Sequence, residues 1–420
     1  MPDTAMANAF AALFLAALGL STGLRLWLAR RQLRHVAAHR ESVPAAFSAS
    51  ITPAAHRRAA DYTADRVRLA MAEVVAGALL VLALTFGGLL QAMHDAWAGL
   101  GLGGLPLGIA FLAGLAVLHA LLDLPFSAYA TFVIEARFGF NKTTPGLFLL
   151  DLAKGALLAA LIGLPLLAAV LWLMQQMGAL WWLHVWLFWL AFNLLMLLAY
   201  PTLIAPLFNK FSPLADAALR DRIEALLARC GFRASGLFVM DGSKRSSHGN
   251  AYFTGFGRSR RIVFFDTLLE ALAPAEIEAV LAHELGHYRL RHVWKRIGLL
   301  ALASLALLWL LGRLIDAPWF YAGLGMHSQG TAPALALFFI ALPAFLFPLS
   351  PLASALSRRH EYEADAYAAE QTRAADLSTA LVKLYRDNAA TLTPDPLYSV
   401  FYDSHPPAAA RIARLQGVTP

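Results

Sequence analysis

Seven long apolar stretches, almost free of charge, constrain the fold of this 420-residue chain more than any other feature. A helix that crosses a bilayer needs about 20 consecutive apolar residues. Charged residues make up only 15% of the chain, against roughly a quarter in ordinary globular domains. A soluble protein is therefore excluded. We predict transmembrane helices within residues 5–24, 71–93, 105–122, 147–174, 180–203, 297–311 and 332–356.

Basic residues crowd some connecting segments and avoid others. Arginines are dense in residues 30–66, and Arg and Lys recur in residues 220–261, whereas residues 91–104, 175–178 and 316–331 contain neither. The positive-inside rule then predicts an external N-terminus and a cytoplasmic C-terminus, with the segment 283–287 that follows these basic residues also on the cytoplasmic side. The net charge of +7 orients the protein in the lipid bilayer and indicates no nucleic-acid partner.

The overall composition also bears on the source of the chain. It is rich in Ala, Leu and Arg, and no ER-retention tail is evident. We therefore expect an integral protein of a bacterial inner (plasma) membrane. Its oligomeric state does not follow from the sequence.

The order of apolar and polar segments predicts the domain organisation of a mainly α, polytopic membrane protein with a small α+β subdomain. Three strands are expected in the polar subdomain, Gly236–Asp241, Asn250–Gly255 and 261–266, the last two joined by a turn at 257–260. We divide the chain into five spans, the subdomain, two further spans and a charged C-terminal segment, at residues 1–207, 208–296, 297–356 and 357–420.

The motif that carries chemistry is His283-Glu-Leu-Gly-His287. Apolar side chains recur at helical spacing around it, so we predict a helix whose one face holds both imidazoles. Two such histidines can bind one zinc ion, and Glu284 beside them is placed to act as a general base. The motif alone leaves open a solvated helix face with two surface histidines.

A catalytic zinc usually takes three protein ligands and leaves a position for water, so a third ligand is required. The only cysteine, Cys230, excludes a cysteine-rich site, and the spacing of His292 is unsuitable. Glu361 and Asp365 stand four residues apart in a charged segment after the last span. We predict that Glu361 binds the metal and that Asp365 fixes the tautomer of a ligating histidine. We expect Glu363 on a solvated face; an ordinary charged juxtamembrane helix is the alternative for this segment.

Several segments of the chain resemble the type I CAAX prenyl endopeptidases, which are integral-membrane HExxH zinc metalloproteases. They are Asn250-Ala-Tyr-Phe, Arg261-Ile-Val-Phe-Phe-Asp-Thr-Leu-Leu, the HExxH motif, Ser357-Arg-Arg-x-Glu-x-x-x-Asp, and Asp395-Pro-Leu-Tyr-Ser with Ser404-His-Pro-Pro. The resemblance implies one zinc ion held by His283, His287 and Glu361. It also implies seven helices around a large water-filled chamber, with the peptide lying along an edge strand.

The resemblance further implies that Asn250 contacts the substrate backbone and that His405 and Arg411 line the cleft near the metal. Taken alone, His405 in a stiff His-Pro-Pro sequence is either a donor to a developing oxyanion or a turn residue. Arg411 either binds a substrate carbonyl or carboxylate or pairs with an acidic residue of the tail.

Polar residues inside the expected spans would be costly against lipid, so we expect them to face an aqueous interior or one another. Asp151 and Lys154, three apart on one helix, are interpreted as an ion pair. The other such residues are Glu73, His119 and Asp123.

The predicted function is a zinc endopeptidase whose substrate is a peptide or protein, prenylated or otherwise membrane-associated. The resemblance implies removal of a C-terminal tripeptide from a prenylated Cys-a-a-X protein. Two alternatives stay open: a membrane quality-control protease of the HtpX type, and a non-proteolytic membrane receptor or transporter with a metal site. A pure carrier needs no general base beside a metal, which favours the protease.

Overall fold

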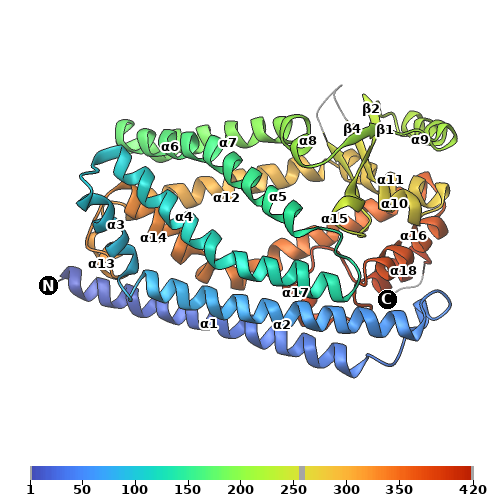
Figure 1. The fold of residues 1–420 in the computed structure, drawn as a ribbon, viewed down its shortest axis with the longest axis horizontal. Coiled ribbons are helices and arrows are strands. Elements are labelled where there is room, and N and C mark those ends of the chain that lie inside the picture. The colour runs from blue at the N-terminus through green and yellow to red at the C-terminus, as the bar shows by residue number, and fades with distance from the viewer. Residues whose placement is uncertain (1, 255–260, 418–420) are drawn as a thin grey trace.

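The structure, a computed structural model, describes residues 2–254 and 261–417 (Figure 1). Within these residues, seven helical segments are long and apolar enough to cross a membrane. The prediction of seven transmembrane helices is therefore confirmed. The segments are Asp3–Ala38, Pro53–Leu84, Gly104–Glu135, Pro145–Gln176, Gly178–Phe208, His292–Leu314 and Thr331–Gln371.

The first half of the chain is helical almost throughout, and three of its spans contain a π-helical segment. These segments are η2 (Ala130–Glu135), η3 (Ala159–Gly163) and η5 (Tyr200–Ile204). The α-helices are α1 (Pro2–Ala38), α2 (Pro53–Leu84), α3 (Leu89–Gly99), α4 (Gly104–Tyr129), α5 (Pro145–Leu158), α6 (Leu164–Gln176), α7 (Trp181–Ala199) and α8 (Ala205–Phe208).

The predicted second span, residues 71–93, is wrong at its far end. The α2 helix ends at Leu84, and Gly88, at φ 72°, begins the separate helix α3. A left-handed backbone conformation is accessible to glycine at little cost, so the chain turns there. A hydropathy window cannot detect this turn, because the residues on both sides of it are apolar.

A small sheet follows the fifth span. Its four strands in the described residues are β1 (Phe211–Pro213), β2 (Gly236–Met240), β3 (Ala251–Thr254) and β4 (Arg261–Phe265), in the order β1-β2-β4-β3. The β2 and β4 strands are parallel, and the other two pairs are antiparallel. The predicted pairing of β3 with β4 is confirmed, while the predicted turn at 257–260 lies outside the described residues. This order leaves β3 at an edge of the sheet.

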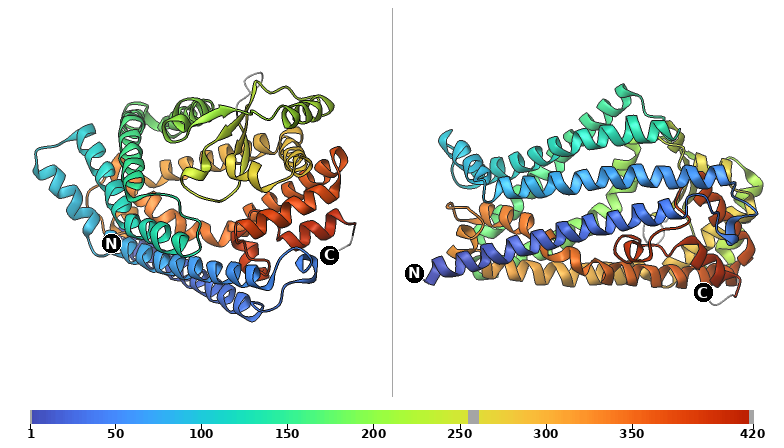
Figure 2. Two further views of the ribbon diagram at one scale, coloured as in Figure 1. Left: turned by 45° about the vertical axis from the view of Figure 1, so that its right-hand side comes forward. Right: turned by 90° about the horizontal axis from the view of Figure 1, so that it is seen from below.

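The second half of the chain supplies the remaining helices. They are α9 (Ala217–Arg229), α10 (Asp266–Ala271), α11 (Pro274–Arg289), α12 (His292–Leu314), α13 (Pro318–Ala322), α14 (Thr331–Leu346), α15 (Ser350–Gln371), α16 (Ala374–Asp387), α17 (Pro396–Tyr402) and α18 (Ala408–Leu415). One hydrophobic core joins the sheet, α9 and α11 to α15 and α16. The polar subdomain and the C-terminal segment therefore pack as one body, at the end of the bundle opposite the N-terminus (Figure 2).

The transmembrane helices surround a chamber. In part of it, α1, α2, α4 and α14 line a cavity of about 760 Å³. Glu73 and His119 line this cavity, as expected for polar groups within spans.

The predicted ion pair between Asp151 and Lys154 is wrong. Asp151 instead accepts two hydrogen bonds from Arg245, at 2.8 and 3.0 Å, and Lys154 donates to the carbonyl of Leu207 at 2.8 Å. Helical spacing shows which residues share a face, but Arg245 is 94 residues away and reaches Asp151 only through the fold.

Candidate active site

The α11 helix carries the HExxH motif and is fixed at its start by two buried glutamates. The chain enters it at Pro274, whose missing N–H costs nothing in the first turn. Glu276 accepts from the backbone N–H of Ala273 at 2.7 Å and pairs with Lys383 at 2.7 Å. Glu278 binds Arg222 and Arg229 of α9, at 2.5 and 2.8 Å. The helix is therefore held by α9 on one side and α16 on the other.

Gly286, inside the motif, allows α15 to approach α11 closely. A Cβ atom at Gly286 would lie 3.0 Å from the Cα of Ala364 and 3.1 Å from its carbonyl oxygen. Such contacts are tighter than most that a Cβ atom makes, so a side chain here would push the two helices apart by a few tenths of an ångström. The small residue therefore brings Glu361 and Asp365 of α15 within reach of the histidines of α11.

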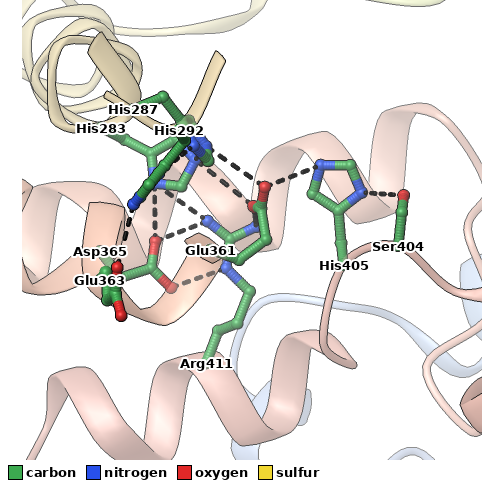
Figure 3. Close-up of polar contacts among 9 residues, drawn as sticks. All are labelled: His283, His287, His292, Glu361, Glu363, Asp365, Ser404, His405 and Arg411. Atoms are coloured by element: carbon green, nitrogen blue, oxygen red, sulfur yellow. Dashed lines mark hydrogen bonds and ion pairs between the residues drawn. The ribbon is translucent and has the colours of Figure 1, made fainter. Parts of the chain in front are cut away.

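Three donor atoms converge where these helices meet (Figure 3). The Nε2 atoms of His283 and His287 are 3.2 Å apart, and the carboxylate of Glu361 lies 3.4 Å from the first and 3.2 Å from the second. His283 and Glu361 are buried, and His287 is partly exposed. The structure thus brings together the three predicted metal ligands, although 74 residues separate His287 from Glu361.

This arrangement fits a tetrahedral metal ion. Ligand atoms about 2.0–2.1 Å from such an ion lie about 3.3 Å from one another, which matches the observed separations. The Oε2 atom of Glu361 is buried without a hydrogen-bond partner among the described residues. His283 and Arg411 lie 3.4 and 3.7 Å from this oxygen, but a buried carboxylate oxygen without a hydrogen bond is costly, and a bound cation would reduce that cost.

Asp365 contacts the ring nitrogen of His283 that points away from the cluster of donor atoms. The Nδ1 atom of His283 lies 2.8 Å from Oδ1 of Asp365, and Arg411 donates to both oxygens of this carboxylate at 2.6 and 2.8 Å. Burial lowers the pKa of His283, but the hydrogen bonds to Asp365 and Glu361 outweigh it and raise the pKa to about 9. The metal-free site therefore keeps a proton that a metal ion must displace.

A second network, not predicted from the sequence, contacts the ring nitrogen of His287 that points away from the cluster of donor atoms. Arg291 adopts a left-handed conformation (φ 58°) between α11 and α12, which places His292, the first residue of α12, beside His287. Their Nδ1 atoms are 3.0 Å apart, and Nε2 of His292 donates to Glu363 at 3.0 Å. The expectation of Glu363 on a solvated face is wrong, because it binds both His292 and Arg359.

Replacing His292 with Phe should weaken metal binding about 10- to 100-fold, the usual effect of losing a partner behind a ligating histidine. The loss would free the ring of His287 to rotate. Competition with a chelator measures this affinity. His360→Phe is the matched control, because this ring stacks on His292 at 4.0 Å without carrying the contact to His287. Equal affinities in the wild-type and His292→Phe proteins would show that His292 does not position His287.

Of the other predicted site residues, His405 and Arg411 contact this cluster. Glu284 is partly exposed on α11, and no hydrogen bond or ion pair within residues 2–254 and 261–417 occupies its carboxylate. His405, 60% exposed, lies with its Nε2 3.4 Å from Glu361 and its Nδ1 3.0 Å from the hydroxyl of Ser404. Asn250 is exposed immediately before β3. Arg411 is 5% exposed and already paired with Asp365.

Asp395 anchors the segment that carries His405. Its side chain caps α17 by accepting from the backbone N–H groups of Leu397 and Tyr398, and it also binds Arg31 of α1 at 3.0 Å. Its backbone N–H donates to Gln32 at 2.7 Å. The Asp-Pro-Leu-Tyr-Ser sequence thus ties the C-terminal segment to the first transmembrane helix, a role that the sequence did not indicate.

Comparison with known proteins agrees with this architecture. Residues 32–210 match the model of the CAAX prenyl protease N-terminal region with five membrane helices, and residues 213–419 match peptidase family M48. The "CAAX prenyl protease 1 homolog" of Arabidopsis thaliana is 41% identical over 316 residues, covering 74% of this chain and 73% of the relative. The homologue of that name from Caenorhabditis elegans is 31% identical over 435 residues, covering 96% and 97%. The crystal structure of S. mikatae Ste24p superposes with a TM-score of 0.88 at 31% identity, over 99% of each chain.

Seven membrane helices and a His/His/Glu cluster beside a small sheet define a polytopic membrane metalloendopeptidase. The chain belongs to peptidase family M48, in the branch that carries the CAAX prenyl protease N-terminal membrane region. These matches do not favour the two alternatives, an HtpX-type quality-control protease and a non-proteolytic receptor or transporter.

Proposed function

We propose that this chain is a zinc-dependent endopeptidase that cleaves membrane-associated proteins near a prenylated C-terminal cysteine. The observation that carries the proposal is the separation of the donor atoms of His283, His287 and Glu361, which suits a tetrahedral ion. The relatives named CAAX prenyl protease 1 homolog support the substrate class.

The metal site would consist of His283, His287 and Glu361, with one zinc ion per chain. Two imidazoles and one carboxylate are a donor set of catalytic zinc sites. When bound, zinc supplies Lewis acidity, which polarises a carbonyl and lowers the pKa of water. Asp365 accepts from Nδ1 of His283 and so fixes the tautomer in which the Nε2 lone pair would be free to bind the metal.

The side chains around the site would move the protons. Glu284 accepts a proton from the attacking water and passes it to the leaving amine, as a general base and then an acid. His405 donates to the oxyanion of the tetrahedral intermediate, which its exposed position beside Glu361 supports. Arg411 would act by holding Asp365 in place. A direct contact between Arg411 and the substrate, which the family resemblance implies, stays a prediction.

The substrate would bind as an added strand. The edge strand β3 offers backbone groups on its free side, and Asn250 precedes it directly, so an extended peptide can pair there. In this arrangement residues 208–296 and 357–420 form the proteolytic unit, and residues 1–207 and 297–356 form the membrane unit. The hydrophobic core that residues 208–296 share with residues 357–420 supports this grouping.

The site would face the cytoplasm. The basic residues in 30–66 and 220–261 support this orientation, with the N-terminus on the other side of the bilayer. A bacterial inner membrane is proposed from composition alone; the relatives compared above are eukaryotic.

The test is cleavage of a farnesylated Cys-a-a-X peptide beside its unprenylated twin by the purified protein in detergent. We expect cleavage with a much lower KM for the farnesylated peptide, and a chelator should abolish it. Cleavage that survives complete metal removal would contradict the metallopeptidase chemistry. Equal KM values would contradict the prenylated substrate class.

A further inference from the structure

The cavity between α1, α2, α4 and α14 is a largely apolar hollow within the membrane part of the protein. These four helices form a ring, in which α1 packs on α2 and α14, and α4 packs on the same two helices. Twenty-one of the 28 lining residues are aliphatic residues, Phe, Met, Pro or Gly. Its volume of about 760 Å³ falls within the range of roughly 300–1,000 Å³ usual for small-molecule sites.

The two ends of the cavity differ. At one end Leu84, Leu335 and Ala336 belong both to the cavity wall and to the buried core of the bundle, so this end is blind. At the other end the wall is completed by Tyr398 and Tyr402 of α17, whose rings stack at 4.4 Å. The chain leaves α17 at Tyr402 and reaches His405 three residues later. The cavity therefore begins beside the catalytic segment and ends in the hydrophobic core.

We propose that this cavity binds the isoprenoid chain of the substrate while the peptide lies at the His283, His287 and Glu361 cluster. This inference rests on the proposed function and extends it from a substrate class to a binding site. In a prenylated Cys-a-a-X substrate, the lipid is attached to the cysteine whose carbonyl belongs to the cleaved bond. The lipid must therefore enter a compartment that adjoins the catalytic cluster.

The shape of the cavity suits a long, thin, apolar chain. On α2 the lining runs from Val67 to Leu84, roughly 25 Å at a rise of 1.5 Å per residue. An extended isoprenoid can lie along this length, with its far end against the blind wall. Its transfer from water into the apolar lining is favourable in proportion to the area buried. Tyr398 and Tyr402, at one end of the cavity, belong to the helix that leads to His405, which favours the substrate over a membrane lipid as the occupant.

Gly77 offers a way to shorten the cavity without disturbing the helix. It lines the cavity on α2, and a Cβ atom there would meet nothing within 4 Å. Gly77→Phe therefore fills open space, and leaving glycine behind favours the helix. The matched control is Gly23→Phe on α1: Gly23 also has nothing within 4 Å of a built Cβ, but it is exposed and does not line the cavity.

The experiment compares KM for peptides that carry geranyl, farnesyl, geranylgeranyl or no lipid. Each methylene that no longer fits costs a factor of about four in binding. We expect Gly77→Phe to raise KM at least ten-fold for the farnesyl and geranylgeranyl peptides, with kcat unchanged. The geranyl and unprenylated peptides should change less than two-fold. Gly23→Phe should match the wild type with all four peptides.

Two results would overturn the inference in distinguishable ways. If the wild type has the same KM for all four peptides, the proposed substrate class fails and the role of the cavity fails with it. If the wild type prefers longer lipids and Gly77→Phe retains that preference, the substrate class stands but this cavity is not the binding site of the isoprenoid. That result is expected if an acyl chain of a membrane lipid occupies the cavity.

A measurement on the wild type covers the case in which Gly77→Phe does not fold. A farnesylated peptide with a diazirine in its terminal isoprene unit should label cavity-lining residues of α2 or α14. Labelling confined to helices outside the ring would overturn the inference.

Discussion

Replacement of Glu284 with Gln lowers kcat by about 10²- to 10⁴-fold and leaves metal binding intact. This magnitude is what general acid–base catalysis contributes. Glutamine keeps the size and the polarity of the side chain, but it cannot accept a proton from water. Glu284 is partly exposed and free of partners in the part of the chain that the structure describes, so its carboxylate is available for this step. The measurement is cleavage of a fluorogenic prenylated peptide, together with metal content per chain.

Glu224→Gln serves as the control, because this glutamate lies on the exposed face of α9. It should cleave at the wild-type rate. A Glu284→Gln protein that retains metal and cleaves at more than a tenth of the wild-type rate would remove Glu284 from the mechanism. Loss of metal from this variant would instead place Glu284 among the ligands.

Replacement of Arg411 with Met destabilises the protein by about 3–5 kcal/mol, the usual cost of removing one partner from a buried ion pair. Arg411 and Asp365 are 5% and 3% exposed, and two hydrogen bonds of 2.6 and 2.8 Å join them. Without Arg411, the charge of Asp365 is compensated only by His283. Metal affinity should fall about 10- to 100-fold as well, because Asp365 orients that histidine. Unfolding in detergent and chelator competition measure the two effects.

The control for this variant lies on the same helix. Arg414 is exposed on α18 and lies over the ring of Tyr362 at 4.7 Å, so Arg414→Met should change stability by less than about 1 kcal/mol. In the double variant Arg411→Met with Asp365→Asn, the buried charge is gone, and part of the lost stability should return. If Arg411→Met unfolds like the wild type, the ion pair does not hold this part of the site together.

The metal cluster follows from the sequence because its parts obey local rules. Two histidines four apart share a helical face, and so do Glu361 and Asp365. That the two helices meet follows from the family resemblance rather than from spacing. Gly286 contributes a physical reason, since a Cβ atom there would press on the backbone of Ala364.

The supporting network could not be predicted, because it depends on contacts that local patterns do not encode. The left-handed conformation of Arg291 decides that His292 lies behind His287, and arginine carries no signal for such a turn. The anchoring of Asp395 to Arg31 joins residues 364 apart. The apolar stretches likewise fix the number of spans but not their ends, as the break between α2 and α3 demonstrates.

The most direct test of the metal site is anomalous diffraction at the zinc absorption edge, from crystals of the purified protein. The structure holds two groups of possible ligands in its described residues, the first formed by His283, His287 and Glu361 and the second by His292, His360 and Glu363. We predict one peak, bonded to the Nε2 atoms of both HExxH histidines and to the carboxylate of Glu361. A peak at the second group alone, or none at the first, would contradict this account.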